Sequence, residues 1–490
     1  MKVSIITEGF YKTGYGHLTR CLSIYHAFEE RNIFPVFFIN GDPDCGKVIP
    51  DTRHMIFDWL KDSEELYKRT AGSDVVIIDS YLAPLEIYNK FSASVSYPVF
   101  IDDYMRLEYQ AGIIINGSIN AEKLNYPVRP DQTLLLGTKY IPLRKDFWRV
   151  RDKLIRPEVQ SVLLTFGGQD TMNMTPRLLQ MLVRNHPALT KKVVVGSGFK
   201  NLELIEAAKD TRTELYHAPL SGDMLRIMLE SDVAFSAAGQ TIYELACVGV
   251  PTIALSVADN QKMNLTEWIN EGFLPEEYSY DSANLENRMM ITFNGYMERE
   301  RRFKLGVIGK KKVDGLGAKR IVQSILDLMI RRNGGCYLRR ANENDAMAVF
   351  NLSNDRTVRL NSINQDVIAW HDHIRWYSEK LNDRNCLFLL AFNANDEFVG
   401  QVRFTVEGQN AIISISLDKN FRGKGLSSSL LIKSSFKYLK DHPEIQSILA
   451  YIRPENTPSI KAFTGAAYLL SHEEKIKGDK FFVYKLARQK

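Results

Sequence analysis

Gly14-Tyr15-Gly16-His17-Leu18-Thr19-Arg20 stands between two segments of different hydrophobic periodicity. An apolar run at residues 3–7 precedes it, and a helical pattern follows from residue 18 to about residue 30. This change across a glycine turn predicts the first strand and first helix of an α/β sheet. In such sheets ligands bind beyond the carboxyl ends of the strands, where a helix N-terminus favours anions. His17 is expected there, either taking up a proton near neutral pH or only capping the helix.

The size and composition of the chain limit its class. At 490 residues it is too long for one hydrophobic core, so about two to four domains are expected. A hydrophobic content of 45%, a charged content of 25% and a net charge of +5 fit a globular protein and give little reason to expect nucleic acid as a partner. No apolar run is long enough to span a membrane, and a first strand starting at Lys2 leaves no room for a signal peptide. The sequence therefore predicts a cytoplasmic protein.

Cysteine usage agrees with that compartment. The cysteines are odd in number, scattered and without a CxxC pair, so neither a disulfide framework nor a zinc site is expected. They are Cys21, Cys45, Cys247, Cys336 and Cys386.

Residues 1–330 alternate buried strands with helical stretches. Continuous runs rich in β-branched residues indicate parallel strands covered on both faces. The pattern starts again near residues 151–159, which predicts two Rossmann-like lobes, residues 1–152 and 153–330, with a ligand cleft between them. The expected strands are 3–7, 36–40, 75–79, 99–102 and 112–116 in the first lobe, and 161–166, 192–195, 232–236 and 251–255 in the second.

A third domain is predicted at residues 336–490. The segment Arg331-Arg332-Asn333-Gly334-Gly335 is polar with paired glycines and is interpreted as a linker. After it, a strand at 337–341 and two helical stretches lead into a meander at 387–392, 398–406 and 411–417. This order indicates an α+β fold with a mixed, largely antiparallel sheet.

The second lobe contains a loop of small residues between a strand and a helix. The segment Ser236-Ala237-Ala238-Gly239-Gln240-Thr241-Ile242-Tyr243-Glu244 follows the expected strand 232–236. Small residues let the backbone approach a pyrophosphate, and the helix N-terminus offers free N–H donors. Glu244, about one turn into the helix, is expected to accept the hydroxyls of a ribose. Gly167-Gly168 and Asn260-Gln261 follow neighbouring strands at the same edge, a set typical of a nucleotide-sugar site.

Residues 1 to about 325 resemble the UDP-sugar hydrolases of pseudaminic acid biosynthesis, which are themselves similar to two-lobed GT-B glycosyltransferases. The resemblance lies in residues 13–21, Ile77-Ile78-Asp79-Ser80-Tyr81, Ile101-Asp102-Asp103, residues 136–147, Phe166-Gly167-Gly168, residues 236–244 and Asp314-Gly315-Leu316-Gly317-Ala318. It implies a GT-B-like arrangement with His17 as the base and UDP held by the second lobe. Glu8 departs from the family, which usually has Asp there, and it receives no role. The implied substrate-binding residues are Gly14, Gly16, Arg20, Asp79, Tyr81, Gly167, Gly168, Ser236, Ala238, Gly239, Thr241, Glu244, Asn260 and Gln261.

Hydrolysis of a UDP-sugar needs no metal in this scheme. UDP leaves readily once helix N-termini hold its charge, and a neutral imidazole can take the proton of the attacking water. Asp42-Pro43-Asp44 imitates the carboxylate pair of metal-dependent glycosyltransferases, but its polar surroundings favour a plain turn, so no metal is expected.

The third domain resembles the GNAT acyltransferases. Phe421-Arg422-Gly423-Lys424-Gly425-Leu426-Ser427-Ser428 follows a strand and opens a helix, as in the acetyl-CoA pyrophosphate loop of that family, with Ser427 in place of the last small residue. The later motif Asn456-Thr457-Pro458-Ser459-Ile460-Lys461-Ala462-Phe463 follows an expected strand at 448–452. The resemblance implies acetyl-CoA as co-substrate, bound by Leu417, Arg422, Gly423, Lys424, Gly425, Leu426, Ser427, Ser428, Asn456 and Ser459.

The acid and base of acetyl transfer are not identified by the motif. Phe463 stands where many relatives have the tyrosine that protonates the leaving thiolate, and Tyr468 is a candidate substitute. A polar group or water near Ser414 and Ser416 is the candidate base. In residues 368–381, which resemble an acceptor-side helix, His371 and His373 point to different faces. Trp370, Ile374 and Tyr377 are expected to be mostly packing residues.

The motifs together predict a fusion of consecutive enzymes: acetylation of a UDP-4-amino-4,6-dideoxy sugar, then hydrolysis of the diacetamido product to UDP and free sugar. Two alternatives remain at this stage, a GT-B glycosyltransferase that uses a UDP-sugar donor and a non-catalytic nucleotide-sugar sensor. The same two steps on a gluco-configured, legionaminic-type sugar are also open. The expected partners are the UDP-amino-sugar and acetyl-CoA, without nucleic acid or membrane.

Overall fold

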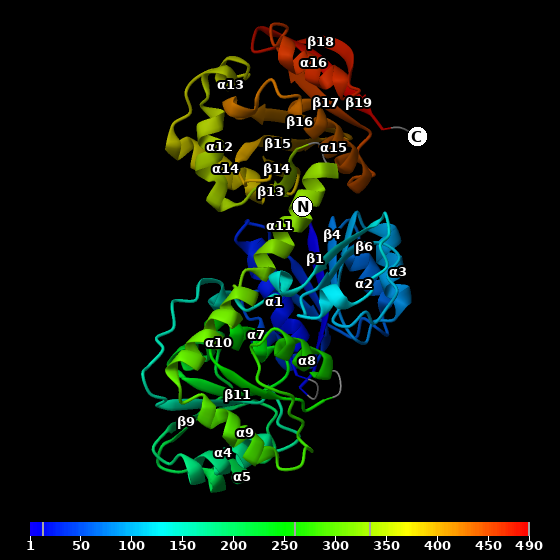
Figure 1. Cartoon of the computed structure of the whole chain (residues 1–490). Helices are drawn as coiled ribbons and strands as arrows, with labels where there is room; N and C mark the ends of the chain where they lie inside the picture. Colours follow the sequence, from blue (N-terminus) through cyan, green and yellow to red (C-terminus); the bar gives the residue numbers. More distant parts are fainter. Residues whose placement is uncertain (12–13, 259–260, 333–334, 489–490) are drawn as a thin grey trace. The chain divides into compact units, whose positions relative to one another are not determined.

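The structure, a computed structural model, describes residues 1–11, 14–258, 261–332 and 335–488. The chain divides into two compact units. One comprises Val3–Glu30 and Phe34–Val322, and the other comprises Met1–Lys2, Arg31–Ile33 and Gln323–Lys490. Helix α11 (Gly317–Arg332) carries the chain from the first unit into the second (Figure 1).

The first sheet is parallel throughout. Its order is β3-β2-β1-β4-β5-β6-β7, so the direction of strand addition reverses between β1 and β4. Ligands of open α/β sheets bind at such a switch point, beyond the carboxyl ends of the strands. The strands are β1 (Val3–Gly9), β2 (Val36–Gly41), β3 (Arg53–Ile56), β4 (Val75–Asp79), β5 (Tyr97–Ile101), β6 (Gly112–Asn116) and β7 (Gln132–Leu136).

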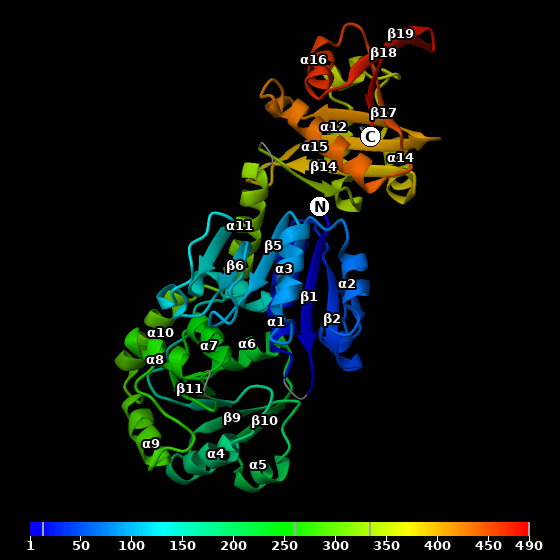
Figure 2. The same ribbon diagram turned by 90° about the vertical axis from the view of Figure 1, so that its right-hand side faces the viewer.

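Helices on opposite faces bury this sheet. Right-handed crossovers in the two directions of strand addition place α1 (Gly16–Glu29) on one face and α3 (Leu85–Ser94) on the other, as Figures 1 and 2 show. Every residue of β1, β4 and β5 is buried, which matches their continuous apolar runs. The remaining helical elements of this lobe are α2 (Ser63–Thr70) and the short 3-10 turns at Pro43–Val48, Ala121–Lys123, Thr138–Tyr140 and Lys145–Arg149.

The second sheet repeats this plan. Its parallel strands run in the order β10-β9-β8-β11-β12, which places a second switch point between β8 and β11. The strands are β8 (Ser161–Thr165), β9 (Thr190–Val195), β10 (Thr213–His217), β11 (Val233–Ala237) and β12 (Thr252–Leu255). The helices are α4 (Met174–Asn185), α5 (Leu202–Ala208), α6 (Ser221–Glu230), α7 (Thr241–Val248), α8 (Lys262–Asn270), α9 (Leu285–Gly295) and α10 (Arg299–Lys312).

The third sheet is mixed. Its order is β13-β14-β15-β16-β17-β19-β18, and all neighbours are antiparallel except β16 and β17. The strands are β13 (Tyr337–Arg340), β14 (Cys386–Phe392), β15 (Phe398–Glu407), β16 (Asn410–Leu417), β17 (Ser447–Ile452), β18 (Leu469–Ile476) and β19 (Asp479–Ala487). The helices are α12 (Ala346–Ser353), α13 (Arg356–Leu360), α14 (Trp370–Asn382), α15 (Leu426–Asp441) and α16 (Thr457–Gly465), with short 3-10 turns at Glu343–Asp345 and Lys419–Phe421.

The fold class predicted from the sequence is correct: two Rossmann-like lobes followed by an α+β domain. The strands β4 and β6 agree with the prediction to the residue. The sequence missed β3, β7, β10, β18 and β19, which are half-exposed or lack a continuous apolar run.

Two local predictions agree with the structure only in part. Helix α11 continues through Arg332, so the predicted linker begins later than Arg331, and its residues 333–334 lie outside the described chain. Tyr377 is buried, as expected of a packing residue, but Trp370 and Ile374 are 41% and 37% exposed, and Trp370 packs edge-on against Phe350 with the ring centroids 5.0 Å apart.

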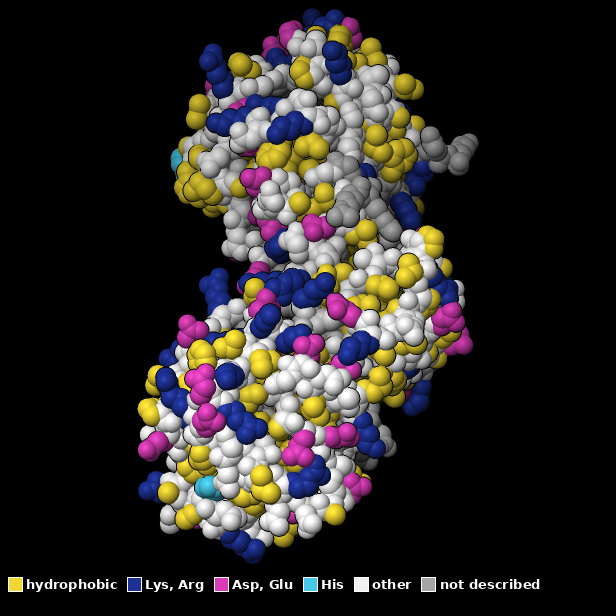
Figure 3. Space-filling model, in the orientation of Figure 1, with side chains coloured by type: hydrophobic (Ala, Val, Ile, Leu, Met, Phe, Trp, Pro, Cys, Tyr) yellow, Lys and Arg dark blue, Asp and Glu magenta, His cyan; other side chains and the backbone are white. Residues whose placement is uncertain are grey.

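The visible surface carries charges of both signs. On the face shown in Figure 3, Lys and Arg side chains are interspersed with Asp and Glu over both units. Among the described residues, no helix is both long enough and apolar enough to cross a bilayer.

Candidate active sites

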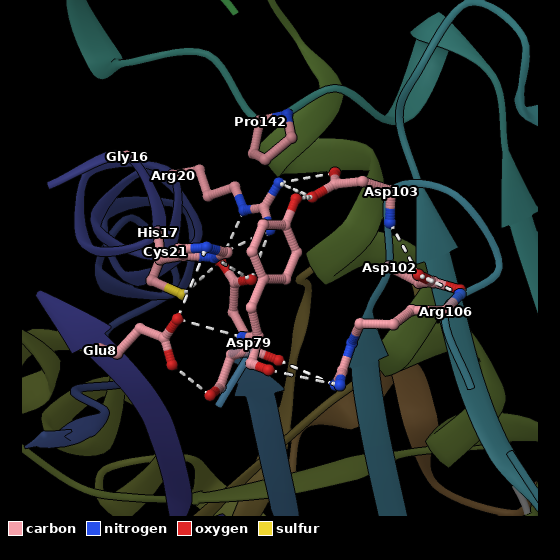
Figure 4. Close-up of polar contacts among 12 residues, drawn as sticks. Glu8, Gly16, His17, Arg20, Cys21, Asp79, Asp102, Asp103, Arg106 and Pro142 are labelled. Carbon is pink, nitrogen blue, oxygen red and sulfur yellow. Dashed lines mark hydrogen bonds and ion pairs between the residues drawn. The ribbon is translucent and has the colours of Figure 1, made fainter. Parts of the chain in front are cut away.

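The first switch point holds a histidine between two acidic side chains. His17 is the second residue of α1, directly beyond the carboxyl end of β1, and Asp79 is the last residue of β4. Gly14 has φ +86°, a conformation that suits glycine, and lets the chain turn from β1 into α1. Figure 4 shows the side chains of His17, Asp79 and Glu8 converging from these three elements. The topology thus brings together two of the residues that the sequence predicted.

A buried carboxylate orients the His17 ring. Asp79 is fully buried, and its Oδ1 lies 2.7 Å from Nδ1 of His17. Because the carboxylate only accepts hydrogen bonds, pairing with it selects the tautomer with the proton on Nδ1, which donates a hydrogen bond to Asp79, while Nη2 of Arg20 lies 3.0 Å from the same nitrogen. The neutral ring then keeps its lone pair on Nε2, and the side chain is 18% exposed. His17 is therefore set up to accept a proton at Nε2.

Arg20 connects the His17–Asp79 pair to a second carboxylate, that of Asp103. Its Nε donates to Oδ2 of Asp79 at 2.6 Å and its Nη2 to Oδ1 at 2.5 Å, while Nη1 donates to both oxygens of Asp103 at 2.7 and 2.9 Å. Tyr81 donates its hydroxyl hydrogen to Asp103, and its ring meets the His17 ring edge-on with the centroids 4.4 Å apart. Asp79 and Arg20 are thus buried positioning residues, whereas the 39% exposed Tyr81 remains open to a ligand.

Glu8 is the functional candidate that sequence reasoning missed. Its carboxylate accepts hydrogen bonds from the hydroxyl of Ser80 and from the backbone N–H groups of Tyr81 and Leu82, the latter two at 3.1 and 3.3 Å. Its Oε1 also lies 3.8 Å from Nε2 of His17. Glu8 therefore fixes the turn that presents Tyr81 and places negative charge beside the proton-accepting nitrogen.

The electrostatics of this cluster keep Asp79 ionised. Burial alone would raise the pKa of Asp79, but the Arg20 guanidinium and the His17 ring outweigh it and hold that pKa well below its usual range. Burial, together with the Asp103 carboxylate, raises the pKa of Tyr81, so its phenol stays protonated. The cluster thus presents a fixed carboxylate behind the imidazole and a neutral phenol beside it.

The second switch point is built from backbone rather than from side chains. Gly167 and Gly168 follow β8, and a Cβ added to either would meet nothing within 4 Å. Ala238 and Gly239 follow β11 and lead into α7, whose first turn begins at Thr241. The open space above these loops and the positive end of the α7 dipole suit an anion, although the Ile242 and Tyr243 N–H groups donate to the carbonyls of Gly239 and Gln240. Ser236 is buried, and its hydroxyl donates to the Ala237 carbonyl, so it offers no side-chain contact to a ligand.

Glu244 is engaged differently from the prediction. Its carboxylate accepts from Nε and Nη2 of Arg144, each at 2.8 Å, and it is only 6% exposed. Its partner Arg144 is 27% exposed. Nearby, the hydroxyl of Tyr243 accepts from the backbone N–H of Ile119 in the first lobe at 3.0 Å. Both contacts join residues from the two ranges predicted as lobes, so α7 is one of the elements through which the lobes are in contact.

The last predicted pair of this lobe is only half described. Gln261 accepts a hydrogen bond from the Val257 N–H at 3.0 Å. Its amide nitrogen lies 3.9 Å from a Cβ built on Gly239, so it borders the glycine loop. Asn260 lies outside the described residues.

In the third domain the predicted loop leads into α15. Gly425 caps this helix with φ +74°, a conformation that favours glycine. Gly423, Lys424 and Gly425 are exposed. Arg422 turns away from the loop: its Nε donates to the Leu417 carbonyl at 2.9 Å and its Nη2 to Asp355 at 2.8 Å. Arg422 therefore fixes the start of the loop.

The parallel strands beside this loop separate. β16 and β17 are in register only over Asn410–Ile412 and Ser447–Leu449, although both strands continue further. Among the described residues, the segment 413–417 of β16 thus has no strand partner on that side. Ser414 and Ser416, near which a base was predicted, are half-buried within it.

Contacts within and around α16 account for several predicted residues. Asn456 caps α16 by accepting from the Ser459 N–H at 3.2 Å, and Ser428 donates to the Ala462 carbonyl at 3.3 Å. Tyr468 is fully buried against Phe463, and its hydroxyl pairs with that of Ser435 at 2.7 Å. Burial raises the pKa of Tyr468. These contacts argue against Tyr468 as the acid of acetyl transfer, because a ligand cannot reach it.

Both carboxylates of the Asp42-Pro43-Asp44 segment are engaged by other protein groups. Asp42 accepts from the Tyr11 N–H at 2.6 Å, and Asp44 pairs with Lys47 at 2.6 Å. Over the described part of the chain, no group of three His, Cys, Asp or Glu residues is placed to hold a metal ion.

Residues 336–466 match the acetyltransferase (GNAT) domain family. The match covers the strands up to the β16–β17 separation, the exposed loop before α15 and helix α16. The third domain is therefore a GNAT-like acetyltransferase domain, as the sequence predicted.

Three curated proteins are similar to larger parts of the chain. An uncharacterized protein of Methanocaldococcus jannaschii is 24% identical over 96% of both chains. The spore coat polysaccharide biosynthesis protein SpsG of Bacillus subtilis is 21% identical over 67% of this chain and 98% of its own length. The pseudaminic acid cytidylyltransferase and UDP-2,4-diacetamido-2,4,6-trideoxy-beta-L-altropyranose hydrolase of Helicobacter pylori is 24% identical over 56% of this chain and 48% of its own length. The chain thus combines a GNAT domain with similarity to proteins of sugar biosynthesis.

Proposed function

We propose that this protein is a bifunctional nucleotide-sugar enzyme. The GNAT domain would acetylate the 4-amine of a UDP-4-amino-4,6-dideoxy sugar with acetyl-CoA. The first unit would then hydrolyse the UDP-2,4-diacetamido-2,4,6-trideoxyhexose to UDP and the free sugar of a pseudaminic-type pathway. The GNAT match and the similarity to a hydrolase of such a sugar support the two halves.

The His17–Asp79 pair carries the hydrolytic half of this proposal. With the Nδ1 proton held by Asp79, Nε2 accepts the proton of an attacking water. The water oxygen forms a bond to the anomeric carbon, the bond between that carbon and the phosphate oxygen breaks, and UDP leaves with the electron pair. Asp79 stabilises the imidazolium that forms, because it stays ionised at neutral pH.

In this proposal UDP binds at the second switch point. Donors at the α7 N-terminus and open space over Gly167 and Gly168 suit the diphosphate, which leaves more easily when its charge is neutralised. Arg144 pairs with Glu244 of α7 through Nε and Nη2, so Nη1 is the donor that this proposal assigns to the leaving group. A reaction in this cleft needs acid–base groups from the first lobe and anion binding from the second.

The acetyltransferase half rests on the loop before α15. Exposed backbone at residues 423–425 and the N-terminus of a 16-residue helix suit the pyrophosphate of acetyl-CoA. The separated segment 413–417 leaves backbone groups of β16 free for the pantetheine amides. The amine attacks the thioester carbon, the C–S bond breaks, and CoA leaves as thiolate while the amine loses a proton to water or a nearby base.

The decisive experiment separates the two halves with one variant. The full chain is incubated with acetyl-CoA and a UDP-4-amino-4,6-dideoxy sugar, while free thiol and UDP are followed separately. His17→Ala should lower the rate of UDP release about 10²–10⁴-fold and leave thiol release unchanged. His26→Ala, at the other end of α1, is the matched control. Unchanged UDP release in His17→Ala would contradict the base assignment, and UDP release only when an acceptor sugar is added would instead show a glycosyltransferase.

A further inference from the structure

The two faces of the third sheet differ next to the strand separation. Val402, Phe404 and Ile413 lie on the face that packs on α15, where Phe404 stacks on Tyr438 with the centroids 4.2 Å apart. The alternate residues lie on the opposite face, where Gln401 is paired in register with Ser416, and Arg403 with Ser414. A polar stripe therefore runs beside the separated segment of β16, on the side away from the helix that begins at the predicted acetyl-CoA loop.

Arg403 is a cation without a protein anion. Its guanidinium lies 4.9 Å from the ring centroid of Trp376 and 5.7 Å from that of Phe388, and in the described part of the chain it makes no hydrogen bond or ion pair. It is half-buried, and burial lowers its pKa. Desolvating a charge is unfavourable unless a partner compensates, and ring stacking compensates only in part. The guanidinium thus keeps its hydrogen-bond donors available for an anion from outside the protein.

A second polar group on the same stripe also lacks its partner. Gln401 is 6% exposed, and its Oε1 is buried without a hydrogen-bond donor among the described residues. It stands two residues from Arg403 on β15, so both side chains face the same side. Within the described chain, the Arg403 guanidinium lacks an acceptor, and Oε1 of Gln401 lacks a donor. This pair fits a ligand that carries both an anion and hydroxyl or amide hydrogens.

We propose that Arg403 binds the diphosphate of a nucleotide-linked amino sugar, with Gln401 accepting a hydrogen bond from the same ligand. This proposal rests on the proposed acetylation and names the part of the acceptor that the domain recognises. The guanidinium fork matches phosphate oxygens in a bidentate contact and repels polycationic amines. The opening between β16 and β17 gives an amine bound on this face a route to a thioester bound on the α15 side.

Steady-state kinetics of CoA release test the assignment in the full chain. Arg403→Met should raise the KM for the UDP-amino-sugar about 10–100-fold, since a hydrogen-bonded contact to a charged group is lost. The kcat and the KM for acetyl-CoA should change less than about threefold. Arg403→Lys should fall between, because ammonium keeps the charge but loses the fork. Arg384→Met removes an exposed arginine of the same domain and should behave as wild type. An acceptor KM in Arg403→Met within twofold of wild type would overturn the proposal.

A binding experiment decides the same question without turnover. The full chain is irradiated with 5-azido-UDP, and the labelled peptides are mapped by mass spectrometry. We expect label within residues 336–490 in wild type and Arg384→Met, lost in Arg403→Met but retained in part in Arg403→Lys. Absence of label from this domain in wild type, or equal label in Arg403→Met, would refute the role of Arg403. Failure of wild type to acetylate any UDP-amino-sugar would instead refute the proposed function, while the labelling would still report on Arg403.

Discussion

The two switch points of the first unit share a topology and differ in chemistry. Between β1 and β4 the site consists of side chains that hold one another, with Asp79 between His17 and Arg20. Between β8 and β11 it consists of glycine backbone, with open space above Gly167 and Gly168. The difference shows what each half of the proposed hydrolysis requires. Proton transfer needs a fixed tautomer, whereas a diphosphate needs room and N–H donors.

Removing the buried carboxylate should break the first site most severely. Asp79→Asn keeps the shape but removes the charge that orients His17 and neutralises Arg20. The rate of UDP release should fall at least about 10²-fold, because the ring loses its fixed tautomer. The free energy of unfolding should fall by ~3 kcal/mol, since the Arg20 guanidinium loses a buried anion. Urea denaturation and UDP release measure the two effects, and Asp44→Asn, an exposed carboxylate of the same lobe, is the control.

The stability loss has a definite pH dependence. The pKa of Asp79 is lower in the folded protein than its unfolded value of about 3.9, so its ionisation stabilises the fold above that value. This contribution is lost as the pH falls from about 5 through the lower folded pKa. The difference in stability between wild type and Asp79→Asn should therefore be constant near neutrality and shrink below about pH 4. A difference that grows on acidification would contradict this role of Asp79.

Filling the second site should affect binding instead of catalysis. Gly168→Ala places a methyl group in the space that the proposal assigns to the diphosphate, where a Cβ meets nothing in the protein within 4 Å. The KM for the UDP-sugar should rise about tenfold, and the melting temperature should stay within about two degrees of wild type because no packed atom moves. Gly222→Ala, on α6 of the same lobe, is the control. A tenfold fall in kcat at unchanged KM would show that Gly168 belongs to the chemical step.

The strands and the two glycine turns could be predicted because their signals are local. An apolar run of five residues and a glycine before a helix are visible in a short window, and His17 stands at a fixed offset from both. The ends of β1 and β4 follow from the same runs. Their adjacency follows only from the three-dimensional strand order, which no local pattern encodes.

The contacts that give each site its character could not be predicted in this way. Glu8 meets Ser80 and Tyr81 more than 70 residues later, and Arg144 meets Glu244 across 100 residues. A polar residue at the end of a buried strand gives no sign of which distant turn it will hold. The buried position of Tyr468 was missed for a similar reason, because the strands that follow it, β18 and β19, were not predicted.

A variant of Glu8 tests whether negative charge beyond the Asp79–His17 pair contributes to the rate of UDP release at the first switch point. Glu8→Gln keeps an acceptor for the Tyr81 N–H but removes the negative charge 3.8 Å from Nε2 of His17. The imidazolium that forms during water attack then loses a favourable electrostatic partner, so UDP release should become slower. The rate at neutral pH should fall about three- to tenfold. Glu8→Asp should stay closer to the wild-type rate, and an unchanged rate in Glu8→Gln would limit Glu8 to holding the Ser80–Leu82 turn.

The smallest effect on kinetics is expected at Gly425, in the exposed loop before α15. Gly425 caps α15 at φ +74°, and a Cβ there meets nothing within 4 Å, so alanine adds only conformational strain of about 1 kcal/mol. Gly425→Ala should raise the KM for acetyl-CoA about three- to fivefold and leave UDP release from the acetylated sugar unchanged. Gly425→Asn should lie closer to wild type, because asparagine tolerates this conformation. An equal rise in the KM for acetyl-CoA in both variants would mean that the cofactor requires exposed backbone without a side chain, and that the left-handed geometry is not decisive. The loop before α15 would then differ in its requirement from the Gly167–Gly168 turn.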